Sequence, residues 1–96
     1  MKIIILDDAE QDLIDGFHFY ERQERGLGDY FLDSVMSDID SLQLFGGIHA
    51  VYFGKQRMMC KRFPFGVYYE VQDETVRIIA VLDQRRDPAW IRKRVE

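Results

Sequence analysis

The sequence predicts an α+β domain in which an antiparallel helical hairpin packs on a small antiparallel sheet. Its 96 residues, 47% of them hydrophobic, suffice for one core and not for two, so we expect one domain over residues 1–96. Apolar residues recur with a helical period in the first half, whereas the second half holds short segments rich in β-branched and aromatic residues. Their order predicts a strand, two helices, three or four strands and a short C-terminal helix.

The first two predicted elements are a strand and a helix. Lys2–Leu6 contains three consecutive isoleucines, a pattern typical of a strand that is buried on both faces. Asp7 precedes Glu10 by three residues, which is the spacing of a reciprocal capping pair at a helix start. We therefore expect a helix that begins at Asp7 and ends near Arg25.

A second helix and a set of strands follow. The helix is expected over Asp29–Phe45, because the helical period continues until Gly46, which is a usual stop. Three strands are expected at Arg57–Phe63, Val67–Gln72 and Thr75–Leu82. Turn signals at Pro64–Gly66 and Asp73–Glu74 join them into an antiparallel meander. Ile48–Phe53 fits either a fourth strand or an extended approach to the sheet.

The last strand is predicted to hold a charged loop in place. Arg77 is the only polar residue of Val76–Leu82, so this strand is expected to be central and buried on both faces. The loop Asp83–Arg86 follows directly and should be rigidly positioned. A short helix is expected at Pro88–Val95, with Asp87 as its cap and the proline at the first helical position.

Charge is distributed unevenly along the chain. The formal net charge is −4, which argues against nonspecific nucleic-acid binding, since such binding needs surplus lysine and arginine. Residues 1–46 hold three cations and eleven acids, whereas residues 47–96 hold ten cations and six acids. An acidic face and a basic face would suit different partners, although solvated helices also carry acids.

Cysteine content and the start of the chain bear on location. The single cysteine, Cys60, has no partner for a disulfide, and no cysteine and histidine cluster is spaced for zinc, so we expect no metal or cofactor. A reducing cytoplasm fits this composition best. The opening MKIIILDD predicts neither a signal peptide nor a membrane span.

Two segments resemble a known family. FPFGVYY at residues 63–69 and LDQRRDPAW at residues 82–90 are similar to the RelE/ParE superfamily of toxins from type II toxin-antitoxin systems. The resemblance covers nearly the whole chain and favours the ParE-like, plasmid-stabilisation branch over the RNA-cleaving RelE branch. It implies a toxin that arrests growth when free and is neutralised in a hetero-oligomer with its cognate antitoxin protein.

The resemblance implies two alternative targets. ParE-like members act on DNA gyrase, whereas RelE-like members cut messenger RNA on the ribosome without a metal. In the RelE-like pattern an arginine precedes the hydrophobic-tyrosine run and a tyrosine lies near the C-terminus, but Gly66, Trp90 and Ile91 occupy those regions here. We therefore expect inhibition of gyrase by binding. The alternatives are an mRNA interferase and an inactive, antitoxin-binding plasmid-stabilisation module.

Cations and one tryptophan form the predicted target-binding set. The set comprises Arg85, Arg86, Trp90, Arg62 and Lys61. Guanidinium groups fit carboxylate and phosphate as forks, and Arg85 matches the family's arginine at the end of the last strand. Structural roles are the alternative, in which the arginines pair with nearby acids and Trp90 folds back onto the core.

An interferase would need further chemistry. It requires a base for the 2′-hydroxyl and cations for the developing phosphorane charge. Arg85 would then face the phosphate, and His49 would be the base because histidine titrates near neutrality. A lone histidine without an identifiable partner is, however, more often structural.

Phe65, Tyr68 and Arg57 are the predicted antitoxin-binding residues. The aromatic side chains could stack on bases, but we expect them instead to fill the core and an exposed groove, and such a groove suits the apolar anchors of an antitoxin helix. Antitoxins of this family are often acidic where they cover the toxin, so they would compete with the target for its cations. Cys60 is interpreted as a packed thiol.

Overall fold

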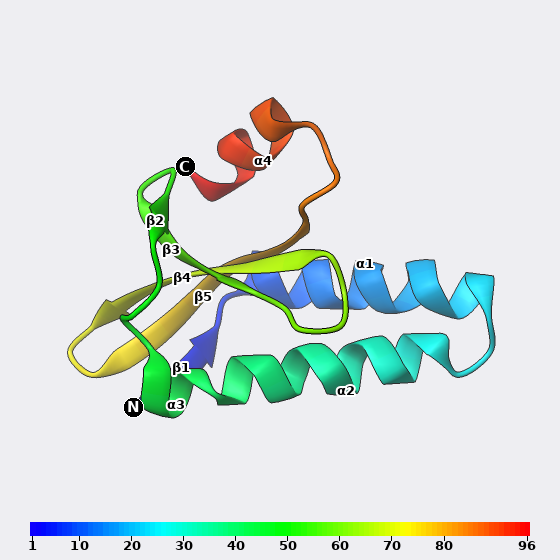
Figure 1. The fold of residues 1–96 in the computed structure, drawn as a ribbon, viewed down its shortest axis with the longest axis horizontal. Coiled ribbons are helices and arrows are strands. Elements are labelled where there is room, and N and C mark those ends of the chain that lie inside the picture. Colours follow the sequence, from blue (N-terminus) through cyan, green and yellow to red (C-terminus); the bar gives the residue numbers. More distant parts are fainter.

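The sheet has five strands in the order β1-β5-β4-β3-β2 (Figure 1). Its strands are β1 (Lys2–Ile5), β2 (Val51–Tyr52), β3 (Lys55–Met59), β4 (Phe65–Gln72) and β5 (Thr75–Asp83). In this computed structural model, which describes residues 1–96, β1 runs parallel to β5 and all other neighbours are antiparallel. The sheet is therefore mixed rather than purely antiparallel.

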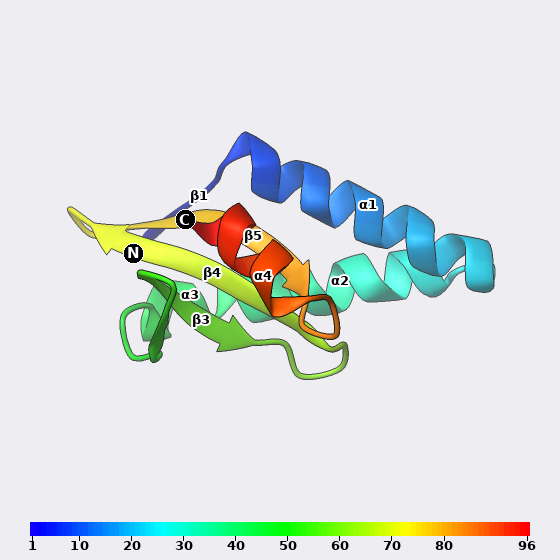
Figure 2. The same ribbon diagram turned by 90° about the horizontal axis from the view of Figure 1, so that it is seen from above.

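Helices cover both faces of the sheet. They are α1 (Asp7–Gln23), α2 (Leu27–Asp40), α3 (Leu42–Phe45) and α4 (Pro88–Val95). The antiparallel α1 and α2 pack on one face, and Figure 2 shows α4 lying across β4 and β5 on the other. None of the helices has the length and apolar content needed to cross a membrane. The predicted α+β class and helical hairpin are confirmed.

Of the two helix N-terminal caps predicted from the sequence, one is present in the structure and one is not. α4 has the predicted bounds, and the Asp87 carboxylate accepts a hydrogen bond from the Ala89 N–H at 3.1 Å, so the predicted cap is confirmed. The predicted capping pair of Asp7 and Glu10 is wrong, because Leu6 is the cap residue and no side chain caps this end. Acids in the first turn of α1 instead face the positive end of the helix dipole.

The second helix and the next strand also depart from their predicted bounds. α2 starts two residues before the predicted Asp29 and ends before Ser41, whose hydroxyl donates to the Asp38 carbonyl oxygen at 2.6 Å; α3 then follows as a separate turn. β3 ends at Met59 rather than at Phe63. The Lys61 N–H donates to the Asp38 carboxylate at 3.1 Å, so it does not form a hydrogen bond with a neighbouring strand.

The structure corrects the start of one predicted strand and the burial of another, and it decides a segment that the sequence left open. β4 starts at Phe65, inside the predicted turn, because Phe65 pairs with Asp83 of β5. The undecided segment Ile48–Phe53 contributes only the two-residue β2. β1 is an edge strand whose isoleucines are half-buried, so its predicted burial on both faces is wrong.

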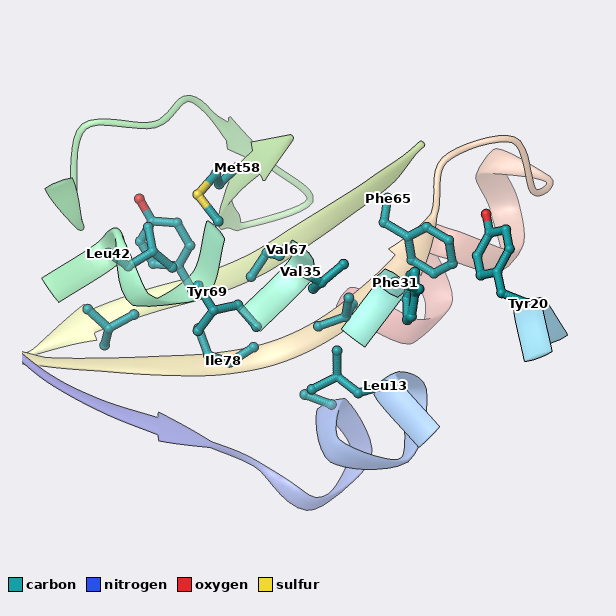
Figure 3. Packing of buried hydrophobic residues seen from close by; sticks show 14 residues of the cluster. Leu13, Tyr20, Phe31, Val35, Leu42, Met58, Phe65, Val67, Tyr69 and Ile78 are labelled. Carbon is teal, nitrogen blue, oxygen red and sulfur yellow. The ribbon is translucent and has the colours of Figure 1, made fainter. Parts of the chain in front are cut away.

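The main core lies between the sheet and the helical hairpin, as Figure 3 shows. At one end of this core the rings of Tyr20 and Phe65 lie 5.1 and 4.9 Å from that of Phe31, measured between centroids. A Cβ atom at Gly16 would lie 2.6 Å from the Phe31 ring, so only glycine lets α1 and α2 approach this closely. A smaller core between the sheet and α4 includes Tyr68.

A buried carboxylate joins α1, β5 and α4. Asp12 accepts two hydrogen bonds from Arg94, both at 2.8 Å, and one from the Val81 N–H at 3.0 Å. β1 ends at Ile5, which pairs with Ile78, so β1 does not reach Val81, and Asp12 accepts the hydrogen bond from the Val81 N–H instead. Burial raises the pKa of Asp12, while the bonds from Arg94 and Val81 oppose that rise. The bonds from Arg94 and Val81 therefore offset part of the cost of burying this carboxylate.

We predict that Asp12→Ala lowers the free energy of unfolding by about 2 kcal/mol, because it leaves the Val81 N–H buried without an acceptor. Asp12→Asn should cost less, since an amide oxygen can still accept that bond. Urea denaturation at pH 7 measures both changes, with Asp15→Ala as the control for an exposed acid on the same helix. Equal midpoints for Asp12→Ala and Asp15→Ala would contradict the role given to Asp12.

Candidate functional site

Two loops meet at one end of the sheet and bring four predicted cations together. The loop of residues 60–64 leads into β4, and the loop of residues 84–87 leaves β5. The Gln84 N–H donates to the Pro64 carbonyl oxygen at 2.8 Å, which holds the loops side by side. We call their four exposed cations the basic rim, and they are Lys61, Arg62, Arg85 and Arg86.

Arg85 is oriented by the acid at the end of β5. Its Nε lies 3.0 Å from Asp83 Oδ1 and its Nη2 lies 2.7 Å from Asp83 Oδ2, which is a two-point ion pair. The Arg85 N–H also donates to Oδ1 at 2.9 Å. These bonds lower the pKa of Asp83. The predicted pairing of Arg85 with a nearby acid is thus present, but 61% of its side chain is still exposed.

Arg86 and Trp90 form a cation–π interaction. The Arg86 guanidinium carbon lies 3.6 Å from the centre of the Trp90 ring, and that of Arg94 lies 5.7 Å from it. Trp90 is half-buried and packs against the core below α4. Trp90 therefore contributes to that core, as the structural alternative predicted, and the rest of its ring lies beside the rim. Its role in target binding stays a prediction. Lys61, Arg62 and Arg86 form no ion pair within the chain.

A groove of about 330 Å³ runs beside the rim, between α1 and α4. α1 lines it with Phe19 and Arg22, and the opposite wall carries Arg86 and Trp90. Phe19 is 43% exposed, which gives the groove an apolar contact area among its charged groups. Such a mixture suits a partner protein chain, because aromatic and arginine side chains are enriched at protein interfaces.

His49 lies apart from the basic rim. Its Nδ1 forms a short hydrogen bond with the Tyr69 hydroxyl, which also accepts from the Gly47 N–H at 3.0 Å. Tyr69 lies four residues along β4 from Phe65, so the Cα atoms of these two residues are about 13 Å apart at ~3.3 Å per residue. Burial lowers the pKa of His49. The structure does not bring His49 and Arg85 together, and the catalytic role of either stays a prediction.

The three predicted antitoxin-binding residues do not form one exposed groove. Phe65 is 6% exposed and belongs to the main core, while Tyr68 is fully buried on the α4 side of the sheet. Arg57 is half-buried beside Tyr68, because the two residues face each other across β3 and β4. Their function in binding an antitoxin stays a prediction.

Gln84 is the residue that the sequence analysis missed. Its Oε1 accepts hydrogen bonds from Arg57 Nη1 at 3.1 Å and from the Tyr68 hydroxyl at 3.0 Å. A Cβ atom at Gly66 would lie 2.8 Å from Gln84 Nε2, so the glycine makes room for this amide. A glycine inside an apolar strand often marks such a close approach, and this signal was present in the sequence.

The half-buried Cys60 lies next to Asp38. Burial, reinforced by the Asp38 carboxylate, raises the pKa of its thiol to about 12. No group of three or more histidine, cysteine, aspartate or glutamate side chains is arranged to hold a metal ion. The site therefore consists of positioned cations and aromatic surfaces, without an activated thiol.

These features define a small α+β domain in which two loops bring four exposed cations together at one end of the sheet. Residues 3–88 match the family model of the ParE toxin of the type II toxin-antitoxin system parDE, and the chain belongs to this family. It is thus a ParE-like toxin of the RelE/ParE superfamily.

The fold also has a solved counterpart. The structure described as the chromosomal ParDE TA system from P. aeruginosa matches with a TM-score of 0.76 at 15% identity, over 84% of this chain and 92% of that chain. At this identity the match establishes a shared fold. No curated protein matches the sequence.

We predict that Cys60 reacts slowly with a thiol reagent between pH 7 and pH 9, because a thiol with a pKa of about 12 stays protonated over this range. Absorbance assays with a chromogenic disulfide reagent measure the rate, and the urea-unfolded protein serves as the reference. Asp38→Asn removes the carboxylate that raises the pKa and should speed the reaction. A native rate at pH 7 equal to the unfolded rate would contradict the prediction.

Proposed function

We propose that this protein is a cytoplasmic toxin that arrests growth by binding DNA gyrase through the basic rim and Trp90, and that a cognate antitoxin protein neutralises it. The observation that carries this proposal is the convergence of two loops on four exposed cations. Lys61, Arg62 and Arg86 have no carboxylate partner in the chain, so they are available to a partner molecule.

The geometry favours binding over RNA cleavage. Cleavage needs a base within hydrogen-bond reach of the 2′-hydroxyl and next to the phosphate-binding cations. His49 instead bonds to Tyr69, toward the other end of β4 from the loop that carries Arg85. Gly66 stands where the RelE-like pattern has an arginine, and Gln84 occupies the space above it. Membership of the ParE toxin family supports the same choice.

Charge supports neutralisation by an acidic partner. The positive charge comes from the basic rim. The groove beside it, between α1 and α4, is lined by three arginines (Arg22, Arg86 and Arg94) and three aspartates (Asp12, Asp15 and Asp83) and adds the exposed ring of Phe19 as an apolar contact. An antitoxin segment with acidic and apolar side chains would match both kinds of contact. Its binding there would cover Arg86 and Trp90 and so exclude gyrase.

We predict that the double substitution Arg85→Ala/Arg86→Ala raises the toxin concentration needed for half-inhibition of gyrase supercoiling by about tenfold or more, because exposed arginines of this kind are frequent hot spots. Growth arrest on induction should be lost in parallel. Arg77→Ala is the matched control, since Arg77 lies near the start of β5 in an exposed pair with Glu70. Unchanged inhibition by a folded double variant would refute the assignment of the rim.

A second experiment separates binding from cleavage. Transcript 5′ ends mapped within minutes of induction should be unchanged while growth stops, because gyrase inhibition leaves messenger RNA intact. New ends at fixed codon positions would reject gyrase inhibition and favour the RelE-like interferase. Growth that continues in cells with abundant folded protein would instead favour an inactive, antitoxin-binding module.

A further inference from the structure

A second hollow, separate from the basic rim, lies beneath α4. It has a volume of about 200 Å³ and is bounded by the β2–β3 hairpin, β4 and the start of α4. Arg57, Tyr68 and Gln84 supply its polar groups, while Tyr52 and Phe53 supply aromatic surface. The hollow is thus a small aromatic pocket that contains one guanidinium group.

Arg57 has no counter-ion in this hollow. Its guanidinium carbon lies 3.7 Å from the centre of the Tyr52 ring, and its Nη1 donates to Gln84 Oε1 at 3.1 Å. No carboxylate forms an ion pair with it, and its Nε–H is buried without an acceptor. A half-buried cation without an opposite charge is costly, and a carboxylate in the hollow would remove that cost.

Around Arg57 there are more hydrogen-bond donors than free acceptors. Gln84 Oε1 already accepts from Arg57 and from the Tyr68 hydroxyl, and Gln84 Nε2 donates to the Leu82 carbonyl oxygen at 3.0 Å. Residues 41–69 include no aspartate or glutamate, so β2, β3 and the loops around them provide no carboxylate. With its spare donors and its unpaired guanidinium group, the hollow therefore suits a negatively charged hydrogen-bond acceptor.

The size of the hollow restricts its occupant. A volume of about 200 Å³ is below the ~300–1,000 Å³ of typical small-molecule pockets, so a nucleotide is too large and a single side chain fits. The rings of Tyr52 and Phe53 would cover the methylene groups of such a side chain, and the Arg57 fork would bind its carboxylate.

We infer that this hollow is a docking pocket for a glutamate or aspartate side chain of a partner protein. The inference rests on the proposed antitoxin, to which it assigns a second anchor point on the α4 face, away from the gyrase-binding rim. The occupant would add the missing charge next to Arg57 and would fasten the partner to the β2–β3 hairpin.

The test is a titration of the isotope-labelled full chain, followed through the Arg57 Nε–H and Gln84 side-chain amide NMR signals. Glutarate is the carboxylate probe, inorganic phosphate is the second anion, and sodium chloride at equal ionic strength is the control. We expect a saturable shift of both signals with glutarate. Arg57→Ala should weaken binding by about tenfold or more, because hydrogen bonds to a charged group are lost.

Arg57→Lys keeps the charge without the fork and should bind glutarate more weakly than the unmodified protein but better than Arg57→Ala, which guards against loss of fold in the alanine variant. Equal shifts with chloride, or unchanged glutarate binding in Arg57→Ala, would overturn the inference. Tighter binding of phosphate than of glutarate would overturn it as well, in favour of a phosphate ligand. The titration involves neither gyrase nor growth, so its failure and failure of the proposed function are distinguishable.

Discussion

The contact of Asp12 with Arg94 and Val81 is the interaction on which both candidate surfaces depend. It connects the first helix to the last one, 82 residues further along the chain, and it satisfies the Val81 N–H at the edge of β5 that β1 does not reach. Breaking it removes the only ion pair that holds α4 against α1. Without that pair the position of α4 would depend on its few apolar contacts with the sheet.

The position of α4 shapes two surfaces with different chemistry. Its first turn places Trp90 under Arg86 and so completes one wall of the groove beside the basic rim. Its inner face, through Ile91, closes the hollow that contains Arg57. A single short helix therefore separates a rim of exposed cations, suited to a large target, from a small pocket suited to one acidic side chain.

Local patterns in the sequence predicted the order of the main elements, but they did not predict all of their bounds or how the site is assembled. The bounds of α4 follow from Asp87 and Pro88 alone, because capping is decided within a few residues. The end of β3 and the buried state of Asp12 depend on partners 23 and 69 or more residues away, which no local pattern encodes. The convergence of the two basic loops likewise follows from the pairing of β4 with β5, which the meander predicted in outline.

Hydrogen–deuterium exchange of the protein, alone and in complex with gyrase, tests the central claim most directly, because it locates the bound surface without any substitution. The account predicts that gyrase slows exchange at residues 60–64 and 84–90 and leaves α3 and β2 unaffected. Slowed exchange confined to α3 and β2, or no change anywhere in a chain that inhibits gyrase, would contradict the claim that the basic rim is the target-binding surface.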